Sequence, residues 1–414
     1  MFIQLNQLRN IIIDADNIHE SYYSDNKYIR FIQQDLKKLN VIIIFRNPWY
    51  KSYYESLDIH NNFIYKDVEN PFFVIGRYLY EMDLHLYESA IITGSQQMVR
   101  TAHNECMSTI LLTRDLSNME HTGLPDHIIM ESENLKEILT EPISGYYNEM
   151  VAEDLKGTGY TYKMGEISHL LFPEIKASLL AGGRYFTSKD HRAYTHCLTN
   201  KLLKLKDCNQ VITDQLAGIL KQNLQTAKNF WGDINIITIV PPKSMGKNHL
   251  GFLLNNNNLN DYRSLIDTDI LYTTRDYPKQ KTAGNWGNRA NNVLNAFASR
   301  RNVNGHIVIV DDILTSGSTT LECARVLYES GAEKISIVPL AVMQSQPDIQ
   351  NLSKVRCSNC MEGVFKLRFN NRDGTAFWAC DQYPHCKNTK NYYRIKNDYN
   401  LQFTMDVDEE ETLS

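Results

Sequence analysis

The 414-residue sequence lacks several features that would define its class at once. No stretch approaches the roughly 18 consecutive apolar residues of a membrane-spanning helix, so we expect no membrane partner. The opening stretch, MFIQLNQLRNII, lacks the basic start and apolar run of a secretory leader. Basic residues are not in excess either, because 43 Lys and Arg stand against 48 Asp and Glu. We therefore expect a cytoplasmic chain without a global attraction for nucleic acid.

The composition also excludes disorder as the main state of the chain. Apolar residues make up 43% and charged residues 22%, close to globular averages. At about 150 residues per domain, the length predicts two to three domains. Only eight cysteines are present, and four of them fall between positions 357 and 386. Because disulfides are rare in the cytoplasm, this cluster indicates a metal site.

Two consecutive segments have the alternating pattern of α/β domains. In residues 1–140, short apolar runs alternate with stretches of helical composition, which predicts a parallel sheet. The expected strands are 10–13, 41–45, 90–93, 109–112 and 127–130, with helices at 28–39 and 72–86. The polar, glycine-containing residues 141–161 are interpreted as a linker.

The second α/β segment covers residues 162–345. Helices are expected at 198–205, 210–225, 288–299 and 319–329, and strands at 234–240, 269–273, 306–310 and 334–341. A short cysteine-rich and aromatic segment follows at 354–403, and the chain ends in an acidic tail at 404–414. The sequence therefore predicts two α/β domains and one small metal-binding domain.

The clearest catalytic motif is HIVIVDDILTSGSTT at positions 306–320. It consists of an apolar strand, the acids Asp311 and Asp312, a loop of small residues and a helix. In open α/β sheets, ligands bind beyond the carboxyl ends of the strands. Backbone N–H groups and hydroxyls of the loop suit a phosphate, while the two acids suit the vicinal hydroxyls of a sugar. The expected phosphate-binding residues are Thr315, Ser316, Gly317, Ser318 and Thr319.

This motif resembles the phosphoribosyl-pyrophosphate (PRPP) loop of type I phosphoribosyltransferases. Its flanks, over about 198–342, resemble the ComF competence family, although Leu250-Gly251-Phe252-Leu253 stands where that family usually has Arg-Gly-Phe-Asn. The resemblance implies displacement of pyrophosphate from ribose C1 with Mg²⁺, catalysed through Asp311 and Asp312, with Lys243 as a cation for the pyrophosphate. Two other interpretations stay open. The acids can simply cap a loop, or the fold can sense PRPP without catalysis.

Two cysteine pairs, C-x2-C and C-x5-C, are separated by nineteen residues. This spacing is typical of a tetrahedral zinc site. Cys357, Cys360, Cys380 and Cys386 would form a closed, structural site that stabilises a segment too small to fold on its own. The surrounding sequence, especially FWACDQYPHCKNT, resembles the zinc ribbon of type IA DNA topoisomerases.

The zinc-ribbon segment is basic within an acidic protein, with nine Lys and Arg against four Asp and Glu over 354–398. Cations interleaved with aromatic rings suit single-stranded DNA, because cations follow the backbone while rings stack on bases. The alternative is that the rings form the core of the ribbon. The aromatic residues concerned are Phe365, Phe369, Phe377, Trp378, Tyr383, Tyr392 and Tyr393.

The N-terminal strand reads IIIDADNI and brings Asp14 and Asp16 to one side of its end. It resembles motif I of haloacid-dehalogenase (HAD) phosphatases, which implies a HAD-like Rossmannoid domain with Asp14 and Asp16 as Mg²⁺ ligands and Lys66 as a further site residue. Ser95 and Arg100 stand where that family has acids, so we expect a degenerate domain without phosphatase activity. A second interpretation is a PIN/NYN-type nuclease domain that uses Asp14 and Asn17. A third is that Asp14 and Asp16 are solvated residues at the end of a strand and have no function.

Together these features predict a three-part α/β protein that combines a HAD-like domain, a type I phosphoribosyltransferase domain and a zinc ribbon. We expect a Mg²⁺-dependent PRPP-binding transferase that acts on or near nucleic acid or nucleotides. Bacterial stress or defence is the process in which we expect it to act. The alternative is a non-catalytic DNA-binding factor of the competence or repair kind, whose transferase fold senses nucleotides.

Overall fold

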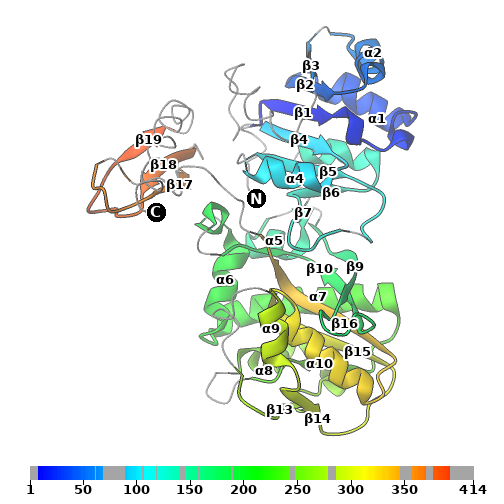
Figure 1. The fold of residues 1–414 in the computed structure, drawn as a ribbon, viewed down its shortest axis with the longest axis vertical. Coiled ribbons are helices and arrows are strands. Elements are labelled where there is room, and N and C mark those ends of the chain that lie inside the picture. The colour runs from blue at the N-terminus through cyan, green and yellow to red at the C-terminus, as the bar shows by residue number, and fades with distance from the viewer. Residues whose placement is uncertain are drawn as a thin grey trace.

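The computed structural model describes residues 8–60, 62–68, 89–104, 107–117, 119–139, 145–155, 159–187, 190–194, 196–242, 248–277, 286–345, 357, 359–369 and 376–391. Figure 1 shows two α/β units stacked along the long axis, with a small three-stranded sheet beside them. Among the helices within these ranges, none is long and apolar enough to cross a bilayer.

The N-terminal unit is built on a six-stranded parallel sheet with the order β3-β2-β1-β4-β5-β6. Five strands lie close to their predicted positions, and every residue of the central β1 and β4 is buried. The sixth, β3, was missed because it is a half-buried edge strand without a continuous apolar run. The strands are β1 (Asn10–Asp14), β2 (Asn40–Phe45), β3 (Phe63–Asp67), β4 (Ser89–Thr93), β5 (Ser108–Leu112) and β6 (His127–Ile129).

Short helices connect these strands. The helix predicted at 28–39 is shorter than expected, since α1 (Asn26–Arg30) continues as a π-helical turn that ends at Asp35. The helix predicted at 72–86 lies outside the described residues. The remaining helices of this unit are α2 (Pro48–Leu57), α4 (Gln96–Asn104) and short 3-10 segments that include Ser132–Leu139.

The second unit has a mainly parallel sheet with the order β12-β15-β16-β10-β9, and β11 pairs with β16. Only β9 runs antiparallel to its neighbour, as the outer strand of a hairpin. The strands are β9 (Tyr162–Ser168), β10 (Lys176–Ala181), β11 (Arg184–Tyr185), β12 (Ile236–Ile239), β15 (His306–Leu314) and β16 (Lys334–Met343).

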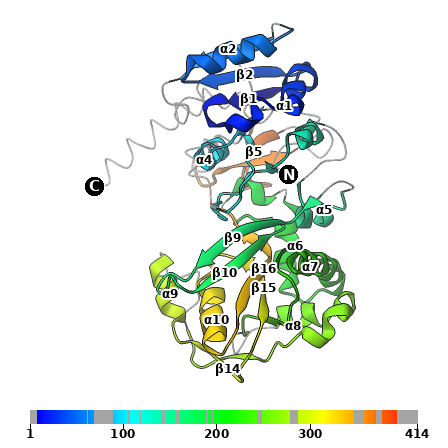
Figure 2. The same cartoon turned by 90° about the vertical axis from the view of Figure 1, so that its right-hand side faces the viewer.

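Helices cover both faces of this second sheet, as Figure 2 shows. On one face, α6 (Cys197–Leu205), α7 (Gln210–Trp231) and α8 (His249–Leu254) share an apolar cluster with β12, β15 and β16. On the other face lie α9 (Trp286–Val293) and α10 (Ser318–Glu329). This three-layer arrangement agrees with the predicted α/β class.

The helix predicted at 288–299 is interrupted. It ends at Val293, and residues 297–299 form β14 (Phe297–Ser299), which pairs with β13 (Leu271–Thr273). The chain reverses at Asn295, whose φ of 57° is left-handed. Glu322 of α10 accepts the backbone N–H of Asn295, and this tertiary contact outweighs the local helical preference.

The expected linker at 141–161 is not a simple connector. Residues 145–160 contain β7 (Gly145–Tyr146), α5 (Tyr147–Ala152) and β8 (Gly159–Tyr160), and β7 pairs with β8. One apolar cluster includes Val99 and Leu111 of the first unit together with Tyr162 and Leu179 of the second. The two α/β units therefore share a packed interface.

Arg184 is the centre of that interface and is 1% exposed. Its guanidinium donates to both carboxylate oxygens of Glu149, each at 2.9 Å, and to Asp126 Oδ1 at 2.7 Å. Burial acts to raise the carboxyl pKa values, but the charge of Arg184 outweighs it and lowers the pKa of both Glu149 and Asp126. Asp126 belongs to the first unit, Glu149 to the segment expected as a linker, and Arg184 to the second unit. Their contacts therefore join three segments of the chain.

Replacing Arg184 by methionine is expected to lower the free energy of unfolding by about 3–5 kcal/mol, because it leaves two buried carboxylates without their cation. Urea denaturation followed by tryptophan fluorescence measures the change. Arg301→Met is the matched control, since Arg301 is exposed and pairs only with Asp267 at the surface, and it is expected to cost less than about 1 kcal/mol. Equal effects of the two replacements would contradict a structural role for Arg184.

Acid is expected to weaken the same interface. Glu149 and Asp126 have lowered pKa values, so the stability they contribute is present above about pH 4 and is lost as pH falls towards their folded-state values. Burial lowers the pKa of His127 to about 4 and also lowers that of His196. Because unfolded histidines bind protons below about pH 6.5, these residues also favour unfolding in acid.

The histidines therefore predict a stability that decreases from pH 7 towards pH 5, and the carboxylates predict a further decrease below about pH 4.5. Urea denaturation midpoints at pH 7, 5.5, 4.5 and 3.5 test this expectation. Glu149→Gln removes one of the titrating groups and should flatten the decrease below pH 5. A midpoint that stays constant over this range would show that the network does not titrate with unfolding.

Candidate functional site

Strand β15 carries the predicted acids to the edge of the second sheet. It lies between β12 and β16, and its residues from His306 to Val310 are all buried. Asp311 and Asp312 follow directly and are the first polar side chains after the apolar run. The strand then leads into a short turn and helix α10, as the motif predicts.

The turn before α10 depends on a glycine. Gly317 occupies the N-cap position with φ 72° and ψ −4°, a left-handed conformation in which a side chain would be strained, and it provides no side-chain cap. The Ser316 hydroxyl accepts the Ser318 N–H at 3.4 Å, and the two hydroxyls contact each other at 3.0 Å. The N–H groups at the start of a helix attract negative charge. The start of α10 lies after the acids, where the motif predicts a phosphate.

A cavity of about 180 Å³ opens at this turn. Four predicted site residues line it, namely Asp311, Thr315, Gly317 and Thr319, together with Val240, Ile313 and Thr320. Ser316, Ser318 and Asp312 are not among its lining residues. The fold therefore brings one acid and the phosphate-loop residues around a single cavity, with the second acid adjacent in the chain.

The two acids have different environments. Asp311 accepts the Thr320 hydroxyl at 3.0 Å, and burial together with the neighbouring Asp312 charge raises its pKa well above the usual range. Asp312 lies 3.1 Å from His249 Nε2 and 3.9 Å from Lys206 Nζ. Burial acts against ionisation of Asp312, but these two cationic partners outweigh it and lower its pKa. Asp311 thus tends to hold a proton, while Asp312 carries the negative charge.

His249 and Lys206 are site residues that the sequence motif did not reveal. Their chain positions are far from β15, and only the packing of α6 and α8 against it brings them to Asp312. One signal in the sequence pointed to this region, namely the departure of residues 250–253 from the ComF pattern. Leu250 and Leu253 of this segment are buried as core residues of α8. His249 immediately precedes this segment. Lys243, the predicted pyrophosphate cation, lies outside the described residues.

The two N-terminal acids have different hydrogen-bond partners. Asp14 is buried at the end of β1, where it accepts hydrogen bonds from the Asn17 amide, at 2.9 and 3.0 Å, and from the Thr93 hydroxyl, at 2.7 Å. Burial raises its pKa, and the charge of Asp16 acts in the same direction. Asp16 accepts the backbone N–H groups of Arg46 and Asn47 just before α2. Both carboxylates of the predicted Mg²⁺ pair are thus engaged by donors of the chain itself.

The other residues that the HAD resemblance implies for this site, Ser95, Arg100 and Lys66, have no carboxylate. Ser95 accepts the Met98 N–H in the first turn of α4, and Arg100 forms an ion pair with Glu120. Lys66 lies on β3. Over the described ranges, the one group of three or more His, Cys, Asp or Glu side chains close enough to hold a metal is the cysteine cluster.

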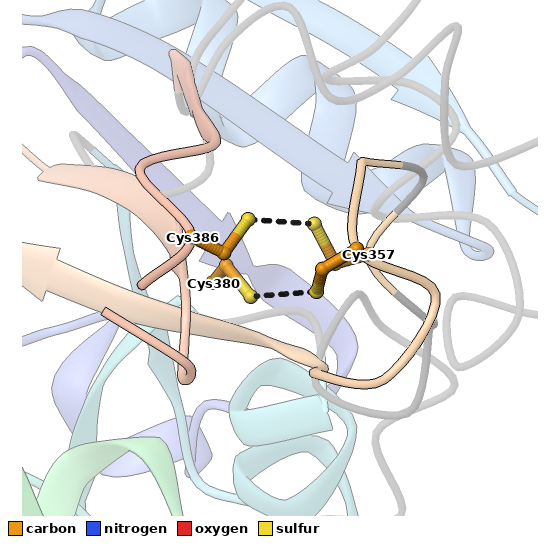
Figure 3. A group of neighbouring side chains, drawn as sticks. Cys357, Cys380 and Cys386 are labelled. Atoms are coloured by element: carbon orange, nitrogen blue, oxygen red, sulfur yellow. Dashed lines mark hydrogen bonds between the residues drawn. The ribbon is translucent and has the colours of Figure 1, made fainter. Parts of the chain in front are cut away.

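The four predicted cysteines do converge. Their Sγ atoms all lie within 4.8 Å of one another. Figure 3 shows Cys357 facing Cys386 across the gap, at an Sγ–Sγ distance of 3.7 Å, and Cys360 and Cys380 are equally far apart. Four sulfurs about 2.3 Å from a tetrahedral ion are about 3.8 Å from each other. The cluster therefore has the dimensions of a metal site.

Hydrogen-bond donors surround these sulfurs. Asn388 donates to Cys357 Sγ at 3.2 Å, and the backbone N–H of Gly363 donates to Cys360 Sγ at 3.4 Å. Burial acts to raise the pKa of Cys357, but the backbone of Cys360 and the Asn388 amide outweigh it and lower that pKa to about 6. Such donors stabilise thiolates, the form that binds metal.

The three antiparallel strands β17 (Phe365–Phe369), β18 (Ala376–Cys380) and β19 (Thr389–Asn391) support the cluster. Phe365 and Trp378 are buried, so these two rings form the core of the ribbon and do not present a stacking surface. Tyr383 is 66% exposed and remains accessible to a base. Tyr392 and Tyr393 lie outside the described residues.

Comparisons with known proteins add no identification: no protein-family model matches the chain, and no curated protein matches it.

Proposed function

We propose that the second α/β unit binds PRPP as its Mg²⁺ complex and transfers the phosphoribosyl group to an acceptor. The observation that supports this most directly is the cavity between Asp311 and the start of α10, where a left-handed Gly317 leaves the helix without a side-chain cap. An anion position beside an acid pair matches a sugar that carries a 5′-phosphate. The resemblance of the motif to the PRPP loop points in the same direction.

In this proposal, the turn from Thr315 to Thr319 binds the 5′-phosphate through backbone N–H groups and hydroxyls. Asp312, as the charged member of the acid pair, accepts hydrogen bonds from the ribose hydroxyls, and Asp311 lies against the cavity. The acceptor attacks ribose C1 while the C1–oxygen bond to pyrophosphate breaks, and the electron pair leaves with the pyrophosphate. Mg²⁺ enters with the substrate and neutralises the leaving group, with Lys243 as the proposed protein cation.

We further propose that Cys357, Cys360, Cys380 and Cys386 hold one structural Zn²⁺. All four coordination positions would be occupied by thiolates, so the ion has no open position for chemistry. Lys366 pairs with Asp381 at 3.6 Å, while Lys387 and Tyr383 are exposed. These exposed groups support single-stranded DNA as the partner of the ribbon, which would bring the transferase to nucleic acid or nucleotides. A role in bacterial stress or defence is consistent with this combination.

The N-terminal unit is a second candidate site. The contact of Asp14 with Asn17, and the use of Asp16 by the backbone at α2, favour the nuclease-like arrangement over the phosphatase pair. A metal held by Asp14 alone would bind weakly, because Mg²⁺ sites usually combine several oxygen ligands. We therefore propose a degenerate Rossmannoid domain whose remaining role is to support the interface at Arg184.

Asp312→Asn is expected to reduce pyrophosphate release from PRPP by about 100-fold or more, because it removes the charge that holds the sugar. Single-stranded DNA binding should be unchanged, since it belongs to the ribbon. Asp269→Asn, at an exposed position of the same unit, is the control and should behave as the unaltered protein. Release of no pyrophosphate by the unaltered protein, with any base, nucleotide or nucleic acid tested, would favour the alternative of a non-catalytic DNA-binding factor.

Metal analysis of the purified chain is expected to give one Zn²⁺ per molecule. Cys360→Ser should reduce the content well below one equivalent and expose the core around Trp378, because binding and folding of such a small domain are coupled. Cys208→Ser, which alters a cysteine outside the cluster, should retain the metal. A zinc content near zero in the unaltered protein would rule out the zinc assignment.

A further inference from the structure

Asp312 is held from two directions by basic side chains of two different helices. His249 is the first residue of α8, and its Nε2 lies 3.1 Å from Asp312 Oδ2. Because a carboxylate only accepts, the imidazole nitrogen is the donor. Lys206, at the end of α6, places its Nζ 3.9 Å from the same oxygen. The basic groups therefore converge on one oxygen of one acid.

The acid pair is asymmetric as a result. Each carboxylate uses Oδ1 to accept the backbone N–H of the following residue, at 2.9 Å for Asp311 and 2.8 Å for Asp312. The Oδ2 atoms differ, since Asp311 receives a neutral hydroxyl from Thr320 and Asp312 receives the imidazole. Asp312 therefore has two basic side chains at Oδ2, whereas the side-chain donor to Asp311 among the described residues is a neutral hydroxyl.

Among the described residues, three further ionisable groups interact electrostatically with the acid pair, namely Tyr185 on β11 with Asp312, and Tyr277 and Cys323 with Asp311. Burial is the main cause that raises the pKa of all three groups, so none of them is ionised near neutral pH. The Asp312 side chain is 14% exposed and that of His249 is 23% exposed, so both remain accessible to solvent.

We propose that His249 is a positioning residue, which holds Asp312 in the orientation that accepts the ribose hydroxyls. The inference rests on the proposed function, because it concerns the same sugar site. The ring of His249 donates a hydrogen bond to Asp312 Oδ2 from α8, and Lys206 lies near the same oxygen from the end of α6. The orientation of Asp312 is therefore set before the sugar arrives.

Three variants separate this role from general packing. His249→Gln keeps a side-chain N–H donor of similar reach but never carries a charge. His249→Phe keeps a ring and removes the donor. His60→Gln changes an exposed histidine of the first unit and is the matched control. Thermal denaturation of all variants identifies any that fail to fold.

The first measurement uses the full chain without ligand. Carboxyl ¹³C NMR of aspartate-labelled protein follows the titration of Asp312, whose signal is assigned by its loss in Asp312→Asn. We expect Asp312 to titrate at higher pH in His249→Phe than in the unaltered protein, with His249→Gln between them. Identical titration in all three proteins would overturn the proposal without reference to any ligand.

The second measurement is calorimetric titration with ribose 5-phosphate, and with PRPP and Mg²⁺. His249→Phe is expected to weaken binding about 10-fold or more, as expected for loss of a hydrogen bond to a charged group. His249→Gln keeps a donor and should bind within about 3-fold of the unaltered protein.

The outcomes distinguish a failure of the proposed function from a failure of the proposed role of His249. If the unaltered protein binds neither sugar phosphate, the proposed function is overturned, and the role of His249 with it. If the unaltered protein binds and His249→Phe binds equally well, only the role of His249 is overturned.

Discussion

The burial of β15 on both faces is the constraint on which the candidate site depends. Because β12 and β16 flank this strand and helices cover both faces, its residues from Ile307 to Val310 are apolar. Asp311 and Asp312 follow where the pairing with β12 has ended, although β15 stays paired with β16 as far as Leu314. The same edge receives the start of α10, so carboxylates and helix N–H groups meet at one cavity.

The edge of the sheet also explains why two adjacent acids differ. Asp311 lies against the cavity wall with a neutral hydroxyl partner, and burial favours its protonated form. Asp312 lies beside α6 and α8, which provide Lys206 and His249. Two carboxylates that are both ionised would repel each other, and among the described residues the basic neighbours, Lys206 and His249, contact Asp312. Charge at the site is thus concentrated on Asp312.

A second buried charge network determines how the α/β units are joined. Arg184 would be costly to bury alone, and it is tolerated because Glu149 and Asp126 satisfy its guanidinium from two different segments. Such a network favours one relative arrangement, since any displacement would leave buried charges unpaired. The cysteine ribbon follows a different principle. Over the described part of the ribbon, the large buried side chains are Phe365 and Trp378, and the four cysteines converge beside them.

The sequence by itself determined the features that depend on neighbours along the chain. Apolar runs located the buried strands of the first sheet and β12, β15 and β16 of the second, but not β9, β10 or β11. The Asp-Asp pair, the Gly317 turn and the cysteine spacing each form a local pattern with a known geometric consequence. Tertiary structure decided what depends on contacts between distant segments. It gave Asp14 and Asp16 different partners, turned the chain at Asn295, ordered the segment that contains Glu149 and brought His249 to Asp312. These outcomes could not be read from the sequence, because each depends on which side chains packing brings within a few ångströms.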